Sequence, residues 1–263
     1  MFDRNSLLSV QAIESIRNFG LIGVYVLEPA EPLPPMTQED LEFERFQIKA
    51  VSGIEEELDR ILKTRKQSRI QTIAEMVIRS YGHLDEKINF YQNLRSLEDY
   101  VFRHSLNVAI LCAMITHVMN IRREEQYHTV CAALLHDMGK LKKHEDVYFG
   151  APYSREDAIR NCETQEEAYS VIEDAFATEG AAIRRICQQA AGKQLDLFPE
   201  EGKESRYKML EGSNVLLVAN RYDEITAMTL QGTAQSEVKA VQELLEHPEV
   251  YDPETVQALL RSI

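Results

Sequence analysis

Apolar residues recur at helical spacing through most of the chain. From about residue 38 to 80 they mostly follow a period of three to four, with charged side chains between them, which is typical of a long amphipathic helix. From residue 85 onward, helical periods succeed one another without an alternating strand pattern, so the main domain is predicted to be all-α. The pattern predicts helices over residues 85–94, 97–120, 123–138, 154–161, 164–190, 206–230, 234–246 and 253–262.

The first 36 residues follow a different pattern. LLSVQAIESIRNFG predicts a helix ending at Gly20, because glycine commonly follows the last helical residue. The next stretch, LIGVYVLEP, is rich in β-branched and aromatic residues and predicts a short strand. EPAEPLPPM then holds four of the chain's eight prolines, which interrupt both helices and central strands. A boundary is therefore expected near residue 36.

Three segments follow from these patterns. We expect a small α+β N-terminal segment, the remnant of a module, with a proline-rich linker over residues 1–36, an amphipathic helical connector over 37–94, and a helical domain over 95–263. The long connector helix has one apolar face, which can pack on the main domain or on a second subunit. The sequence leaves both arrangements open, including a homodimer through the N-terminal helices.

Charge and hydropathy exclude two classes of partner. The chain has 43 acidic and 29 basic side chains and a net charge of -14, which repels a phosphate backbone, so we expect no binding to duplex nucleic acid. A local pocket can still hold one small phosphorylated ligand. Apolar runs such as VAILCAMI fall far short of about 20 residues, and the N-terminus lacks a basic-then-apolar signal. We therefore expect a cytoplasmic protein without a membrane partner.

The stretch AALLHDMGKL, residues 132–141, places His136 and Asp137 side by side after an apolar run. Neutral imidazole and carboxylate are good ligands for zinc, manganese or iron. His104, in YVFRHSLNVAIL, shares its helical face with apolar residues that point it toward the core. A lone histidine on such a face is more often hydrogen-bonded, but a separate His-Asp pair favours a metal site.

These residues also carry a family resemblance. HSLNVAIL at 104–111 and ALLHDMGK at 133–140 resemble the HD superfamily of metal-dependent phosphohydrolases, named for its His-Asp pair. The chain is most similar to the HD-GYP family, whose members hydrolyse the bacterial messenger cyclic di-GMP. That similarity continues in VLLVANRYDEITAM and YDPETVQALL and covers about residues 95–263.

The resemblance implies a helical domain holding two or three divalent ions, with His104, His136 and Asp137 as ligands. It implies that Lys140 contacts the phosphate of the substrate and that Asp137 and Lys140 are catalytic. Gly139 would let the chain turn closely beside the site.

The chain departs from the family pattern at several ligands. Phe176 stands four residues before Gly180, where the family has a histidine, and Asn220 replaces an aspartate. The stretch ICQQAAGKQLDLFPEEGKES lacks the paired histidine, and only Phe198 and Pro199 resemble the GYP signature. The remaining set is His104, His136, Asp137 and Asn220. Because two close divalent ions need bridging carboxylates to offset their repulsion, we expect one manganese, iron or zinc ion, or none.

Other polar residues near these segments fit weaker interpretations. Asp223 fits better as the second aspartate of the family segment than as a substitute ligand. His144 and Asp146 are in a loop and are expected to be solvated rather than to supply missing ligands. The other histidines show no partner pattern and are expected to be structural or exposed: His83, His117, His128 and His247.

Three hypotheses for function follow. In the first, the chain is a degenerate HD-GYP-type protein of bacterial cyclic-dinucleotide signalling, non-catalytic or weakly active, that works by binding a cyclic dinucleotide or nucleotide or through a helical interface. In the second, it is a single-metal phosphodiesterase or nucleotidase that uses His104, His136 and Asp137. In the third, it is a helical scaffold in which the His-Asp pair only forms hydrogen bonds.

Overall fold

The computed structural model describes residues 38–84, 99–141, 154–198, 208–227 and 234–263. The predicted N-terminal helix and strand, the helix predicted over 85–94, and the loop with His144 and Asp146 lie outside these ranges. The chain divides into two units, Met1–Glu42 and Phe43–Ile263. Within the described ranges of the second unit every regular element is helical, which confirms an all-α main domain.

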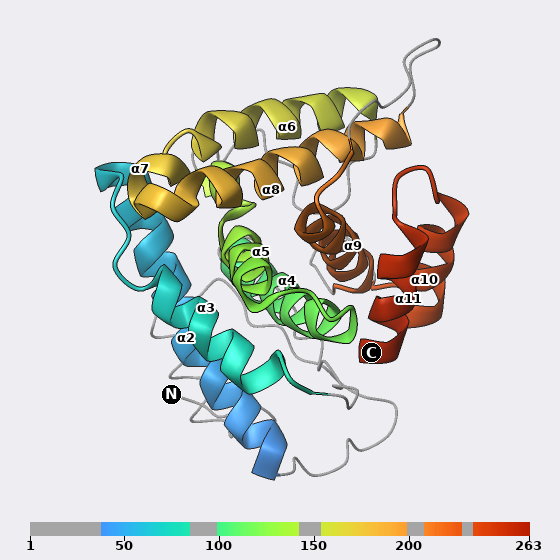
Figure 1. Ribbon diagram of the computed structural model, residues 1–263, viewed down its shortest axis with the longest axis horizontal. Helices are drawn as coiled ribbons and strands as arrows, with labels where there is room; N and C mark the ends of the chain where they lie inside the picture. Colours follow the sequence, from blue (N-terminus) through green and yellow to red (C-terminus); the bar gives the residue numbers. More distant parts are fainter. Residues whose placement is uncertain (1–37, 85–98, 142–153, 199–207, 228–233) are drawn as a thin grey trace, which may run out of the picture. The chain divides into compact units, whose positions relative to one another are not determined.

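Helices α4 (Tyr100–Val118) and α5 (Arg123–Leu135) lie at the centre of this unit (Figure 1). Because α4 is apolar on all sides, almost the whole helix is buried. It ends in a Schellman turn, in which Asn120 has a φ of 55° and the Ile121 N–H donates to the Thr116 carbonyl at 2.9 Å. This short connection returns α5 along α4.

The predicted connector folds as two helices, α2 (Gln38–Thr64) and α3 (Ile70–Tyr81), rather than as one helix over 38–80. Arg65 has a φ of 55° just after α2. Glu57 Oε2 then accepts hydrogen bonds from the Ser68 and Arg69 amides at 2.6 and 2.8 Å, which satisfies N–H groups at the start of α3. The apolar faces of both helices join the core of the second unit. The homodimer arrangement stays a prediction.

The helices predicted over 154–161 and 164–190 are wrong in their boundaries. Helix α6 (Arg155–Tyr169) runs through the predicted gap, and the chain breaks later, at the short helix α7 (Ile172–Phe176) and the 3₁₀ turn η2 (Ala177–Glu179). Ala177 has a φ of 49°, and a Cβ on Gly180 would stand 2.6 Å from Glu173 Cα. The next helix can therefore begin this close to α7 only at a glycine.

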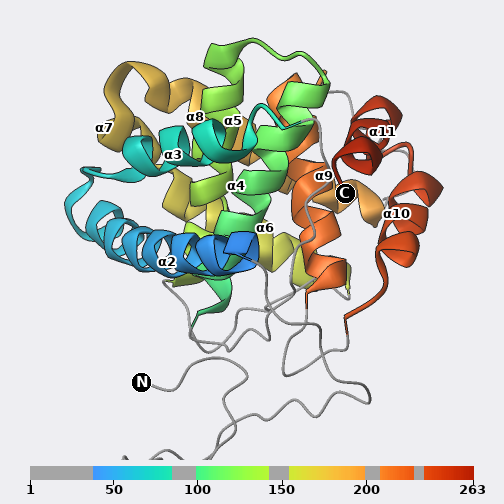
Figure 2. The same cartoon turned by 90° about the horizontal axis from the view of Figure 1, so that it is seen from below.

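The remaining helices enclose the central pair. Helix α8 (Gly180–Lys193), followed by the 3₁₀ turn η3 (Gln194–Leu197), lies beside α6 on one side of α5. Helix α9 (Glu211–Thr226) contacts α4, α5 and α8, and α10 (Glu237–Glu246) and α11 (Pro253–Ser262) pack against it (Figures 1 and 2). Helices α4, α5, α6 and α9 thus bring residues that are distant in sequence to one place.

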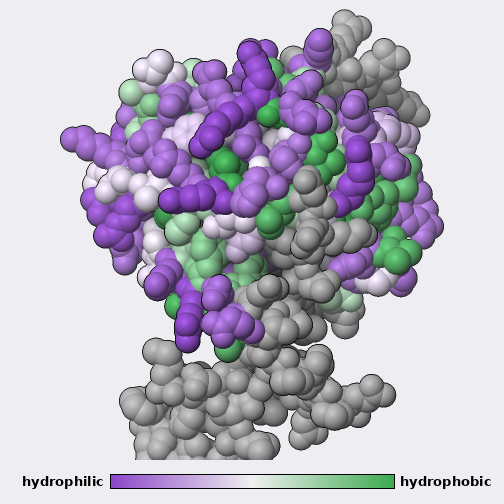
Figure 3. All heavy atoms as spheres, turned by 60° about the horizontal axis from the view of Figure 1, so that its bottom comes forward, coloured by the Kyte–Doolittle hydropathy of each residue, from purple (hydrophilic) through white to green (hydrophobic). Residues whose placement is uncertain are grey.

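Polar side chains cover most of the coloured surface in Figure 3. Helix α4 is long and apolar enough to cross a membrane by length and composition, but 83% of that window is buried inside the structure. Such burial is found in core helices of soluble proteins. A cytoplasmic location itself stays a prediction.

Candidate metal centre

Four side chains from α4, the end of α5 and α9 converge at the centre of the bundle. His104 Nε2 lies 3.1 Å from His136 Nε2, and Asn220 Oδ1 lies 2.8 Å from the first nitrogen and 2.9 Å from the second. The Asp137 carboxylate oxygens lie 3.5 Å from His104 Nε2 and 3.7 Å from His136 Nε2. All four side chains are buried. The structure therefore brings the four predicted ligands together.

Both imidazole rings present a lone pair to this point. His104 Nδ1 lies 2.6 Å from Asp223 Oδ2, and His136 Nδ1 lies 2.7 Å from the Ala133 carbonyl oxygen. Because a carboxylate and a carbonyl can only accept, each Nδ1 carries the proton and donates it. Each Nε2 is then left as an acceptor.

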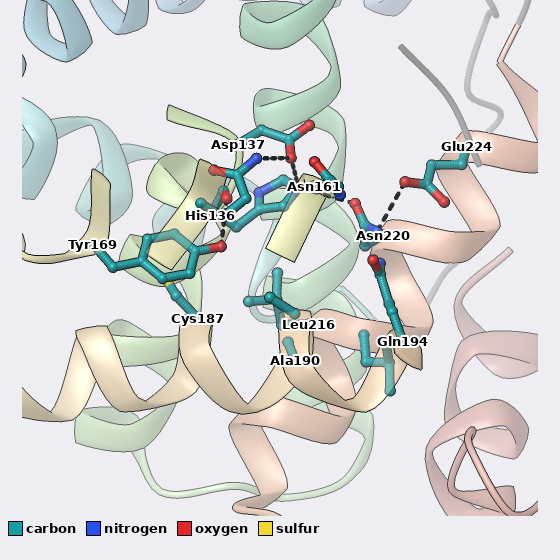
Figure 4. Close-up of a pocket in the computed structure, with 13 residues that line it drawn as sticks. His136, Asp137, Asn161, Tyr169, Cys187, Ala190, Gln194, Leu216, Asn220 and Glu224 are labelled. Atoms are coloured by element: carbon teal, nitrogen blue, oxygen red, sulfur yellow. Dashed lines mark hydrogen bonds and ion pairs between the residues drawn. The ribbon is translucent and has the colours of Figure 1, made fainter. Parts of the chain in front are cut away.

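Asn220 is oriented in the same way. Its Nδ2 donates to Glu224 Oε1 at 3.1 Å (Figure 4), so its carbonyl oxygen faces the two imidazole nitrogens. Three acceptor atoms thus stand 2.8 to 3.1 Å apart.

The fourth group, Asp137, is held by two donors. Lys140 Nζ donates to Oδ2 at 2.7 Å, and Gln165 Nε2 donates to Oδ1 at 3.0 Å. Burial alone would raise the pKa of Asp137, but the Lys140 ammonium and the nearby imidazoles outweigh it and hold that pKa well below its usual range. Asp137 is therefore ionised at neutral pH.

Burial also sets the charge of His136. It lowers the pKa of the imidazole to about 4, against the opposing attraction of Asp137. His136 is therefore neutral at pH 7, the form in which an imidazole binds a metal.

The donor set fits a divalent cation. Nitrogen and oxygen ligands bind zinc at about 2.0–2.2 Å in a tetrahedral arrangement, so two neighbouring ligands of one ion stand roughly 3.3–3.6 Å apart. The Asp137 oxygens lie 3.5 and 3.7 Å from the two imidazole nitrogens, close to this range. The contacts between His104, His136 and Asn220 are shorter, so these three atoms would move apart slightly around an ion.

The charged groups around the candidate ligands also favour a bound cation. The groups directly around the ligands include three carboxylates, Asp137, Asp223 and Glu224, and one ammonium, Lys140. Arg221 lies 3.5 Å from Glu224, so with all five groups ionised the cluster has one excess negative charge, which favours a bound cation.

A small pocket with a cavity volume of about 20 Å³ lies beside these groups, which is room for about one water molecule or ion. His136, Asp137 and Asn220 line it together with apolar residues of α8 and α9 (Figure 4). The Oδ1 atom of Asn161, another lining residue, is buried and has no hydrogen-bond partner within the described ranges. This volume is far below that of sites for drug-sized molecules, and Asn161 offers a bound group one more polar contact.

The structure shows what Lys140 and Asp223 contact, which the sequence left open. Lys140 is 1% exposed and its ammonium group contacts Asp137, so its role as a phosphate contact stays a prediction. Asp223, expected as the second aspartate of the family segment rather than as a substitute ligand, is the partner of His104 Nδ1.

Other candidates lie away from the cluster. Phe176, at the position of the family histidine, is buried in the apolar core. Within the described ranges the structure brings together one group of metal-binding type, His104, His136 and Asp137. The remaining described histidines are not in it.

Two residues of α6 complete the site and were missed by sequence reasoning. Gln165 donates to Asp137 and accepts from the Gly139 amide at 2.9 Å. Tyr169 donates its hydroxyl to the His136 carbonyl at 2.6 Å. With Asn161 these residues recur every four positions, so the signal was a polar stripe on one face of α6.

The bundle and its buried donor set define a helical domain with a candidate metal site. Residues 101–225, which contain all four convergent side chains, match the family model of the HD domain. The match supports the HD superfamily, whose domains generally bind a divalent metal. A comparison with curated proteins found no match.

Proposed function

We propose that this protein is a single-metal phosphohydrolase of the HD type. The HD domain over residues 101–225 suggests a metal-dependent phosphohydrolase. The observation that carries the proposal is the convergence of His104, His136, Asp137 and Asn220, each fixed by a second hydrogen bond. These four side chains would hold manganese, iron or zinc.

When bound, a divalent cation supplies Lewis-acid chemistry that lowers the pKa of water and polarises a phosphoryl oxygen. The protein's own groups prepare the site for that chemistry. Asp137 keeps its negative charge because Lys140 donates to it. The Lys140 ammonium also places positive charge where a phosphate that reaches Asp137 would bind. Asn161 offers its buried carbonyl oxygen to a hydroxyl or amino group of the substrate.

A second candidate function is non-catalytic binding of a cyclic dinucleotide or nucleotide, as in a degenerate HD-GYP-type protein of bacterial signalling. It is favoured by Phe176, which is packed in the core where that family has a histidine, and by Asn220 in place of an aspartate.

The first test is metal content by elemental analysis of untagged protein purified without chelator. His136→Ala is the site variant, and His247→Ala, at a histidine whose ring nitrogen lies 3.1 Å from the nearby Glu249 carboxylate, is the matched control. We expect about one equivalent of metal in the wild type and in His247→Ala, and none in His136→Ala. Turnover is then measured with manganese on nucleoside monophosphates, bis-p-nitrophenyl phosphate and cyclic di-GMP.

Each outcome discriminates between the hypotheses. Metal with turnover that is lost in His136→Ala supports the phosphohydrolase. Metal with saturable cyclic di-GMP binding but no turnover supports the signalling protein. No metal and no turnover refutes the phosphohydrolase and leaves a signalling or scaffold role. If cyclic di-GMP does not bind either, the His-Asp pair serves only a scaffold, where His136→Ala costs about 1–3 kcal/mol of stability.

A further inference from the structure

Glu224 lies one helical turn after Asn220 on α9, and its side chain is 2% exposed. Its Oε1 accepts the Asn220 amide at 3.1 Å (Figure 4). Its other oxygen lies 3.5 Å from Arg221 Nη1, and Arg221 Nε donates to Glu243 of α10 at 2.9 Å. The Glu224 carboxylate is therefore held on one side by Arg221 and on the other by the Asn220 amide.

An asparagine can present either end of its amide to the site. With Oδ1 inward, as here, it can bind a cation. With the NH₂ group inward, it would donate hydrogen bonds to the lone pairs of His104 Nε2 and His136 Nε2, which lie 2.8 and 2.9 Å from the inward atom. That state satisfies both imidazoles without a metal. An aspartate has two equivalent oxygens and no such alternative.

We propose that Glu224 is a positioning residue that makes Asn220 a metal ligand. An ionised carboxylate only accepts hydrogen bonds, so it selects the state in which the NH₂ group points outward and the carbonyl oxygen points into the site. Glu224 thereby compensates for the missing aspartate. This inference rests on the metal binding in the proposed function, but it needs no turnover.

The test measures Mn²⁺ affinity of the full chain by calorimetry, with thermal stability in chelator as a second readout. Loss of a partner that orients a ligand typically weakens metal binding about 10–100-fold, and we expect this loss in Glu224→Ala. Glu224→Gln retains an accepting oxygen and should lose less. The melting temperature without metal should fall little, because the turned amide can bond to both imidazoles.

A double-variant comparison separates positioning from a general structural role. Asn220→Asp needs no orientation, so adding Glu224→Ala in that background should leave Mn²⁺ affinity unchanged or raise it, because a like charge is removed. Glu243→Ala is the control: it removes a carboxylate near Arg221 that does not contact the amide, and it should change affinity less than about threefold.

Three results overturn the inference. They are an unchanged affinity in Glu224→Ala, an equal loss from Glu224→Ala in the wild type and in the Asn220→Asp variant, and an equal loss in Glu243→Ala. A wild type that binds no Mn²⁺ refutes the proposed function and this inference together. A wild type that binds Mn²⁺ with no effect of Glu224→Ala refutes only the inference.

Discussion

Gly139 lies against α6, where no side chain has room. A Cβ at this position would stand 2.6 Å from the Thr164 carbonyl oxygen, 2.6 Å from Gln165 Oε1 and 2.9 Å from Gln165 Cα. Two of these three atoms belong to the backbone, so rotation of a side chain cannot relieve the contact. Gly139→Ala therefore pushes the turn η1 (Met138–Leu141) away from α6.

The cost follows from two effects. Overpacking of a buried position costs about 1–3 kcal/mol. The displacement also weakens the bonds of Gln165 to the Gly139 amide and to Asp137, at 2.9 and 3.0 Å, each contributing about 1 kcal/mol. We expect a loss of about 2–4 kcal/mol in the free energy of unfolding. We also expect Mn²⁺ affinity to fall at least about tenfold, because Asp137 is no longer held in place.

Urea unfolding in chelator measures the first effect and calorimetry with Mn²⁺ the second. Gly192→Ala is the matched control, because a Cβ there meets no atom within 4 Å and alanine in a helix is favoured over glycine by up to about 1 kcal/mol. If Gly139→Ala is as stable as Gly192→Ala, the close approach of η1 to α6 does not determine stability and the reasoning fails.

Three further variants or conditions probe the same structure. Lys140→Met leaves the buried Asp137 charge without its ion pair. The free energy of unfolding should fall by about 3–5 kcal/mol in chelator, but by less in excess Mn²⁺. An equal fall in both conditions would contradict a cation beside Asp137. In chelator, the stability of the wild type should fall between pH 6.5 and pH 4, by up to about 3 kcal/mol, because His136 has a pKa of about 4 when folded and the unfolded chain binds the extra proton. Urea titrations of His136→Asn should show a flatter profile in that range, and an unchanged slope would rule His136 out as the cause. Glu57→Ala removes the acceptor for the Ser68 and Arg69 amides and should cost about 1–3 kcal/mol in the same assay. Its control, Glu56→Ala, removes only an exposed ion pair with Arg69 and should cost under about 1 kcal/mol. Equal effects of the two variants would show that Glu57 does not cap α3.

The ligand positions were predictable because their chemistry is visible in the sequence. His136 and Asp137 follow an apolar run, and His104 falls on a buried helical face, so the helical period alone places these residues in the core. Asn220 and Asp223 came from the resemblance to a family segment, and the structure places both in the site. Gln165 was missed because a neutral amide indicates nothing until a partner such as Asp137 is beside it.

The helix breaks were less predictable. The turns after α2 and α7 contain Arg65 and Ala177 at positive φ, where glycine or asparagine would have given a signal. The turn at Arg65 is stabilised by Glu57, a residue in the preceding helix. Such tertiary stabilisation overrides local propensity and cannot be inferred from the period of apolar residues.

The contact between His104 and Asp223 has a consequence for synthesis of the protein. These residues are 119 positions apart, and a ribosome adding about 5–20 residues per second needs roughly 6–24 seconds to make that stretch. Helix α4 is apolar all round, and throughout this interval it cannot be covered by α9. The nascent chain therefore exposes a helix apolar enough to resemble a membrane span, and early pairing with α3 and α5, which both pack on α4, is its first protection against aggregation.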